Sequence, residues 1–166
     1  MVEEAIRIEA ARESDADGIR LLMEANLAAN GGSLSADLSR GQILALMREL
    51  PMVVARQGER IAGFLLTSSI ESGRAIPILQ AMLAAYAGGP DAYVYGPVCV
   101  AADLRGQGVA QAMFEALLRL LPGREGVLFV RADNEPSLRA HARMGMREVA
   151  RFDYRDTAHV VFAYRG

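Results

Sequence analysis

A glycine-containing turn at residues 105–110 has the residue types best suited to bind a ligand. It lies between a predicted strand at residues 92–100 and a predicted helix that begins near Val109. Glycine has no side chain to keep a ligand away from the backbone, and the first N–H groups of a helix have no partner within the helix. These groups and the partial positive charge of the helix N-terminus favour a phosphate. The alternative is a tight turn with no ligand.

A dinucleotide site of the Rossmann type is one kind of site that could use such a turn. It requires a third glycine at position 111 and an acidic residue at the end of the next strand. Asp133 meets the second requirement, but position 111 is Gln111, and five residues separate the strand from Gly106. The remaining chain is also too short for the second half of that fold. The sequence therefore disfavours an oxidoreductase that binds NAD.

The same turn carries the first of two motifs that resemble the GNAT superfamily of N-acetyltransferases. That family's signature is Arg/Gln-x-x-Gly-x-Gly/Ala after an apolar-x-apolar strand end, and here Val98-Cys99-Val100 precedes Arg105-x-x-Gly108-x-Ala110. The resemblance implies acetyl-CoA as the donor, with the strand residues Val98, Cys99 and Val100 pairing with its pantetheine arm. The pyrophosphate would lie near Arg105, on backbone N–H groups of Gly106, Gln107, Gly108, Val109 and Ala110.

The second motif follows the next predicted strand at the family's spacing. Asn134 and Ser137 are implied to contact the far end of the pantetheine arm. Where the family has an aromatic-Tyr pair and then Gly-Phe, this chain has Ala140-His141 and Gly145-Met146. His141 thus occupies the place of the family's usual tyrosine, which acts as general acid near the donor. Two motifs at the correct mutual spacing are far more specific than either alone.

Acetyl transfer to an amine needs a neutral amine, a polarised carbonyl and a proton for the leaving thiolate. Deprotonating an amine with a pKa of about 10.4 at pH 7 costs roughly 4–5 kcal/mol. His141, with an ordinary pKa of about 6.5, could supply the thiolate's proton; the alternative is a partly exposed helix histidine. Tyr95 is nearest to the glutamate that many relatives use as base. Its pKa of about 10 suits orienting the substrate or a water, so we hypothesise a water relay without a dedicated base.

The remaining residues that could act as nucleophiles or metal ligands do not indicate another catalytic site. Cys99 lies in an apolar strand and is expected to be a small buried hydrophobic residue. His159 alternates with apolar residues in the last predicted strand, which places it on a solvated face. Two histidines and one cysteine show no metal-ligand spacing, so no metal site is predicted.

Apolar periodicity and turn residues predict an α/β chain of alternating strands and helices. The predicted strands are residues 5–10, 52–55, 60–69, 92–100, 127–130, 147–154 and 159–164. The predicted helices are residues 14–30, 39–50, 76–86, 109–121 and 136–144. Ser14 is the predicted N-cap of the first helix, and residues 57–59 are the predicted turn of a hairpin between the strands at 52–55 and 60–69. This order matches the GNAT (acyl-CoA N-acyltransferase) fold, which implies a mixed, mostly antiparallel sheet with helices on both faces. Gly96-Pro97 interrupts one strand and predicts a bulge or a point where central strands separate.

Length and composition limit the remaining possibilities. A chain of 166 residues suits a single domain over residues 1–166, because domains most often have about 100–150 residues. No run approaches the roughly 20 apolar residues of a membrane span, and residues 1–4 do not resemble a signal peptide, so we expect a cytoplasmic protein. A net charge of −2 argues against nucleic-acid binding. All 18 basic residues are arginine, which excludes lysine Schiff-base chemistry.

The expected function is therefore an N-acetyltransferase. It would move an acetyl group from acetyl-CoA to a primary amine of a small molecule or peptide, by direct attack in a ternary complex. The alternative is a catalytically silent acyl-CoA-binding domain that senses or regulates. A homodimer is possible, because dimers are common in the family that the chain resembles.

Overall fold

The computed structural model describes residues 4–34 and 36–166. Residues 1–3 of the acidic N-terminal stretch lie outside this description. The chain divides into two compact units, the first up to Thr67 with Gly96–Leu121, the second Ser68–Tyr95 with Pro122–Gly166. The chain passes from one unit to the other inside strands β3 (Arg60–Ser69) and β4 (Tyr93–Val100). A single domain over residues 1–166 stays a prediction.

The first unit contains a sheet in the order β1-β2-β3-β4. Strand β1 (Ile6–Ala10) is antiparallel to β2 (Val53–Gln57), which is antiparallel to β3. The predicted hairpin turn between β2 and β3 is present, with Gly58 at φ 61°. Directly after the C-terminal end of β4, the Ala101 N–H donates to the Ala62 carbonyl oxygen at 2.8 Å. This hydrogen bond holds the C-terminal end of β4 beside β3.

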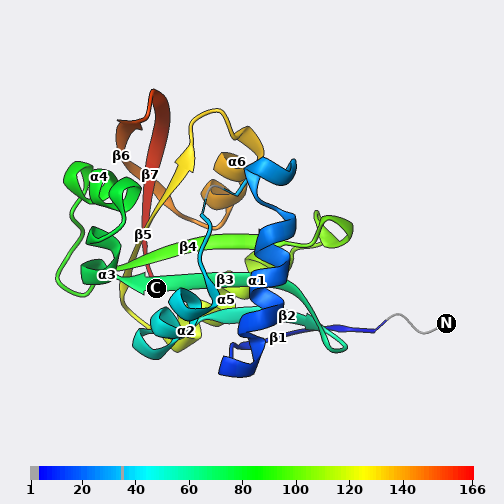
Figure 1. Cartoon of the computed structure of the whole chain (residues 1–166). Coiled ribbons are helices and arrows are strands. Elements are labelled where there is room, and N and C mark those ends of the chain that lie inside the picture. Colours follow the sequence, from blue (N-terminus) through cyan, green and yellow to red (C-terminus); the bar gives the residue numbers. More distant parts are fainter. Residues whose placement is uncertain (1–3, 35) are drawn as a thin grey trace. The chain divides into compact units, whose positions relative to one another are not determined.

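Three helices cover the two faces of this sheet (Figure 1). Helices α1 (Ala16–Ala25) and α2 (Arg40–Glu49) pack on the face that carries Val54 and Phe64. Helix α5 (Val109–Leu120) packs on the opposite face against β1 and β2. A Cβ at Gly63 would lie 3.2 Å from both Ala55 Cβ and Met113 Cε, so the glycine lets α5 approach β3 closely. Single 3₁₀ turns are η1 (Glu13–Asp15), η2 (Ala28–Asn30) and η3 (Ala102–Leu104).

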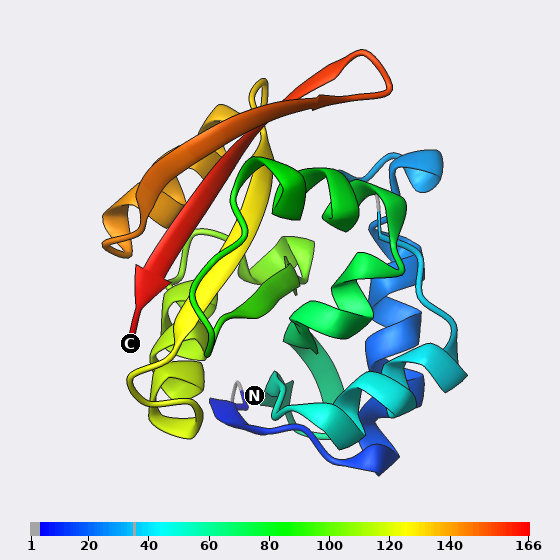
Figure 2. The ribbon, with the colours of Figure 1, turned by 90° about the vertical axis from the view of Figure 1, so that its left-hand side faces the viewer.

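The second unit contains strands in the order β4-β5-β7-β6. In this unit, β4 pairs in parallel with β5 (Glu125–Arg131) at Tyr93 and Val94. Tyr95 is the next residue of β4 and lies outside these pairs. This short pairing agrees with the separation predicted near Gly96-Pro97. Strand β7 (Thr157–Arg165) is antiparallel to both β5 and β6 (Arg147–Tyr154). Figure 2 shows β6 and β7 side by side as a long hairpin.

Helices also lie on both faces of the second unit (Figure 2). Helices α3 (Ile70–Arg74) and α4 (Pro77–Ala85) cover one face, where Met82 and Leu83 pack with Val127 and Val161. Helix α6 (Glu135–Arg143) covers the other. The sequence predicted one helix over residues 76–86 and missed α3, which is only 5 residues long. The mixed, mostly antiparallel α/β fold is confirmed.

Helix starts show which local predictions hold. Helix α2 begins directly after Ser39, as predicted. A capping box holds this start, since Ser39 Oγ accepts from Gln42 N at 3.1 Å and Gln42 Oε1 accepts from Ser39 N at 2.8 Å. Ser14, however, is not the cap of α1. Asp15 Oδ2 instead accepts from Arg12 N at 2.9 Å in a 3₁₀ turn before the helix. No helix in the described part of the chain is long and apolar enough to cross a bilayer.

Candidate active site

The glycine turn of the first unit has an open backbone at the start of α5. Gly106 and Gly108 have φ angles of 77° and 79°, in the left-handed region that glycine adopts without strain. A Cβ at either position would have no described atom within 4 Å. The Ala112 N–H donates to the Gly108 carbonyl oxygen at 3.0 Å and so makes the first hydrogen bond of the helix. The backbone N–H groups before Ala112 belong to the first turn and have no partner within the helix. This geometry fits an anionic diphosphate.

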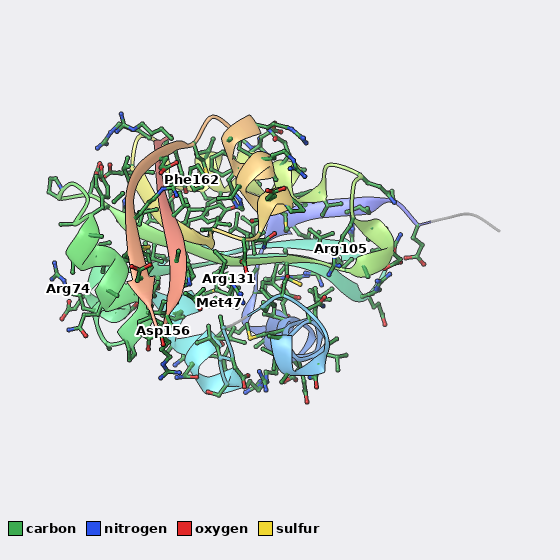
Figure 3. The ribbon with its side chains drawn as sticks, turned by 90° about the horizontal axis from the view of Figure 1, so that it is seen from above. Met47, Arg74, Arg105, Arg131, Asp156 and Phe162 are labelled. Carbon is green, nitrogen blue, oxygen red and sulfur yellow. The ribbon has the colours of Figure 1, made fainter. Side chains whose placement is uncertain are left out.

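The side chain of Arg105, labelled in Figure 3, forms hydrogen bonds that connect this turn to two other segments of the first unit. Its Nε donates to the Val100 carbonyl oxygen at 3.2 Å, and its Nη2 donates to Asn26 Oδ1 at 2.8 Å. Cys99 beside it is 7% exposed, and burial raises the pKa of its thiol to about 11. A thiol that stays protonated near pH 7 is a poor nucleophile, in agreement with its expected role as a small buried residue.

In the second unit, the imidazole of His141 lies between Ser137 and Tyr95. His141 Nδ1 is 2.8 Å from the Ser137 carbonyl oxygen, and Nε2 is 3.2 Å from the Tyr95 hydroxyl. A carbonyl oxygen can only accept, so Nδ1 carries the proton and donates it to Ser137. In the neutral imidazole Nε2 then accepts, and the Tyr95 hydroxyl donates to it. The predicted catalytic residues Tyr95 and His141 are therefore hydrogen-bonded partners.

Burial keeps both members of this pair uncharged. His141 is 5% exposed and Tyr95 is 3% exposed. Burial lowers the pKa of His141, partly offset by its bond to the Ser137 backbone, and burial raises the pKa of Tyr95. The sequence left two interpretations of His141, a proton donor with an ordinary pKa and a partly exposed helix histidine. The structure instead gives a neutral hydrogen-bond acceptor, because the helix turns this side chain inward.

A pair of tyrosines beside Tyr95 was not predicted from the sequence. The hydroxyl groups of Tyr93 and Tyr164 hydrogen-bond to each other, and the Tyr164 ring meets the Tyr95 ring edge-on, with centroids 6.0 Å apart. The Tyr164 ring crosses β5 directly over Gly126. A glycine at the edge of a predicted buried strand is the signal that could have indicated this close approach.

Asn134 and Ser137, which the second motif singles out, lie in the first turn of α6. Asn134 Oδ1 caps the helix by accepting from Ser137 N at 3.3 Å. Ser137 Oγ lies 3.2 Å from His141 Nδ1. Tyr95, Asn134, Ser137 and His141 are thus joined by hydrogen bonds within the second unit, whereas residues 98–100 and 105–110 belong to the first.

Two acidic residues near the ends of β4, Asp91 before the strand and Asp103 after it, could act as bases but are held in ion pairs. Asp91 Oδ2 lies 2.9 Å from Arg165 Nη1, and Asp103 Oδ1 lies 2.6 Å from Arg60 Nη2. Each arginine lowers the pKa of its partner carboxyl. A carboxylate with a lowered pKa is a weaker base, so neither residue is favoured for proton abstraction from an amine.

The expectation that His159 lies on a solvated face is wrong. His159 is 4% exposed, stacks on Phe152 with ring centroids 4.9 Å apart, and meets Phe129 edge-on at 5.3 Å. Its Nδ1 has no hydrogen-bond partner among the described residues. The neighbouring Ala158 is the exposed residue, so the alternation indicates two faces but does not tell which of them is covered at His159.

The fold and the two motifs together are those of an acetyltransferase. The model of the acetyltransferase (GNAT) family matches residues 8–146. The chain therefore belongs to this family. A comparison with curated protein sequences finds no match.

Solved structures with this fold include several acetyltransferases. Ard1 from Thermoplasma volcanium is 18% identical, with a TM-score of 0.72 over 97% of each chain. The ribosomal-protein-S18-alanine N-acetyltransferase from Escherichia coli is 15% identical, with a TM-score of 0.70 over 97% of this chain and 94% of that one. NAA60 from Arabidopsis thaliana, in complex with acetyl-CoA, is 15% identical, with a TM-score of 0.69 over 97% and 98%. These similarities confirm the predicted GNAT fold.

Proposed function

We propose that this protein is an acetyl-CoA-dependent N-acetyltransferase that acts on a primary amine of a small molecule or peptide by direct attack in a ternary complex. Family membership supports acetyl transfer. Among the similar structures, one carries acetyl-CoA and another is an N-acetyltransferase for an alanine of a ribosomal protein. The observation that carries the proposal is the buried hydrogen bond between Tyr95 and His141, because it supplies a route for protons that a binding domain does not need.

Donor binding is proposed for the open turn of the first unit. The backbone N–H groups of residues 106–110 would hold the pyrophosphate, beside Arg105, and residues 98–100 would pair with the pantetheine arm. Asn134 and Ser137 are proposed to contact the arm as well. The side-chain carbonyl oxygen of Asn134 already accepts a hydrogen bond as the helix cap, so the side-chain NH₂ is the group that would donate to the pantetheine arm. When bound, acetyl-CoA supplies an activated acetyl thioester.

The Tyr95–His141 pair is proposed to carry one proton from nitrogen to sulfur. As the neutral amine attacks, Tyr95 Oη accepts a proton from the nitrogen and passes its own proton to His141 Nε2. His141 is then an imidazolium. It returns the Nε2 proton to Tyr95 Oη as the Tyr95 hydroxyl protonates the leaving thiolate. One proton leaves nitrogen, one reaches sulfur, and the pair regains its starting state. In this form His141 keeps the acid role expected from the sequence, acting through Tyr95, in place of a water relay.

Substitution of the two residues tests this proposal. General acid–base catalysis contributes about 10²–10⁴-fold, so Tyr95→Phe and His141→Gln should each lower kcat by about this factor. The stabilisation of the protein by CoA should persist in both variants. Tyr154→Phe, a tyrosine substitution elsewhere in the second unit, serves as the matched control. Full activity of Tyr95→Phe in a thiol-release assay with an amine library would refute the proton route.

A silent acyl-CoA sensor is the second candidate, and the burial of the pair favours it. Side chains that are only 3% and 5% exposed could serve packing alone. CoA binding without thiol release, across amines that include peptide N-termini and polyamines, would establish this alternative. Cytoplasmic location, a homodimer and the class of amine stay predictions from the sequence.

A further inference from the structure

Ser137 presents two oxygens to the same nitrogen of His141. Its carbonyl oxygen lies 2.8 Å from Nδ1, and its hydroxyl oxygen lies 3.2 Å from the same atom. Both come from a residue one helical turn before His141, so the helix fixes the carbonyl oxygen and brings the side-chain hydroxyl within reach of the same nitrogen. The titratable neighbour on the opposite side of the imidazole is Tyr95 of β4, and β7 contributes the uncharged ring of Phe162, 6.5 Å away (labelled in Figure 3).

We propose that Ser137 is a positioning residue for proton transfer, in addition to any contact with the donor. Its carbonyl oxygen holds the proton of neutral His141 on Nδ1, which leaves Nε2 free to accept from Tyr95. Its hydroxyl oxygen acts when the imidazolium forms, as a second acceptor for the Nδ1–H group. This inference rests on the proposed function, because it gives Ser137 a role only if His141 changes its protonation state during the reaction.

The physical basis is the difference between the two charge states. Hydrogen bonds to an ionised group are about twice as strong as those between neutral groups. The Ser137 hydroxyl therefore stabilises the imidazolium more than it stabilises neutral His141. Because burial disfavours the charged form, this second acceptor lowers the barrier to forming it. The step involves no extra reactant, since the proton on Nδ1 stays on Nδ1 throughout.

Three variants separate this role from a structural one. Ser137→Ala removes the hydroxyl and keeps the carbonyl, Ser137→Thr restores a hydroxyl, and Arg139→Ala alters the exposed face of the same helix as control. We expect Ser137→Ala to lower kcat roughly 10-fold, the factor that loss of a hydrogen bond to a charged group gives, with little change in the KM for the amine; a lost contact with the donor arm would appear separately, in the KM for acetyl-CoA. Ser137→Thr should regain most of this loss.

Nitrogen NMR of His141 supplies the decisive readout. Wild type and Ser137→Ala should both show the Nδ1–H tautomer at pH 7, but Ser137→Ala should show a lower imidazole pKa. An unchanged pKa together with an unchanged kcat would overturn the inference. If His141→Gln itself leaves turnover unchanged, the proposed function of the pair fails instead, so the two failures are distinguishable.

Discussion

Adding one methyl group at Gly126 should break the tyrosine arrangement beside Tyr95. A Cβ at this position would lie 2.2 Å from Cζ and 2.3 Å from Oη of Tyr164. Ordinary contacts between carbon atoms are about 3.5–4.0 Å, so the ring must move by more than 1 Å. The ring has little freedom to move, because its hydroxyl is bonded to Tyr93 and its edge meets Tyr95.

The expected cost of Gly126→Ala follows from these contacts. Overpacking a core costs about 1–3 kcal/mol, and a buried hydroxyl that loses its partner costs about 1–3 kcal/mol more. Replacing glycine in a strand returns roughly 0.5–1 kcal/mol. We therefore expect a net loss of about 1–5 kcal/mol in the free energy of unfolding, measured by urea denaturation. Because Tyr164 packs against Tyr95, kcat should fall as well.

A double-mutant cycle tests the assigned cause. Tyr164→Leu removes the ring over Gly126, so in that background the further change Gly126→Ala should cost less than about 1 kcal/mol. Gly41→Ala is the control, because a Cβ there meets only Ser39 Oγ at 4.0 Å and alanine favours the helix. An equal cost of Gly126→Ala with and without the Tyr164 ring would refute the reasoning.

Three further predictions concern stability and modification. Burial lowers the pKa of His159, so as the pH falls the imidazole is protonated in the unfolded chain before it is protonated in the folded protein. The free energy of unfolding should therefore fall as the pH drops below about 6.5. His159→Phe should reduce this loss between pH 7 and 5 by up to about 1.4 kcal/mol per pH unit, measured by urea titration. Asp15 and Arg56 form a buried ion pair at 2.9 Å, so Asp15→Asn should lower the free energy of unfolding by about 2–4 kcal/mol; a loss below 0.5 kcal/mol, within the range usual for surface changes, would contradict this. Because the chain has no lysine, incubation with acetyl-CoA should give N-acetylation at the N-terminal amine alone; peptide mass spectrometry that finds an acetylated internal nitrogen would contradict this.

Features set by neighbouring residues in the chain could be predicted from the sequence. The start of α2 after Ser39 and the hairpin turn at Gly58 each depend on a few consecutive residues. The strand, glycine turn and helix around residues 105–110 are equally local. The short helix α3 was missed because 5 residues show too little periodicity, and its cap at Ser69 directly follows a strand.

Burial of individual polar residues could not be predicted in the same way. His159 alternates with apolar residues, as a half-exposed strand would, yet Phe152 and Phe129 from two neighbouring strands cover it. These partners are fixed by strand order, with β7 between β5 and β6, and a periodic pattern does not specify which strand is the neighbour. Alternation therefore indicates two faces, but only the packed sheet decides which positions are covered.

The same limit explains why the sequence named Tyr95 and His141 but not their relationship. The two residues are 46 positions apart, and each was named for a different reason, His141 for its place in the second motif and Tyr95 for lying nearest to the family's glutamate base. An ordinary histidine pKa suggested a proton donor, whereas the Nδ1 bond to Ser137 and burial make this imidazole an acceptor. Residue type supplies the candidate groups for acid–base chemistry. Which ring nitrogen can accept a proton depends on which one already carries a proton, and here a helix carbonyl one turn away decides that.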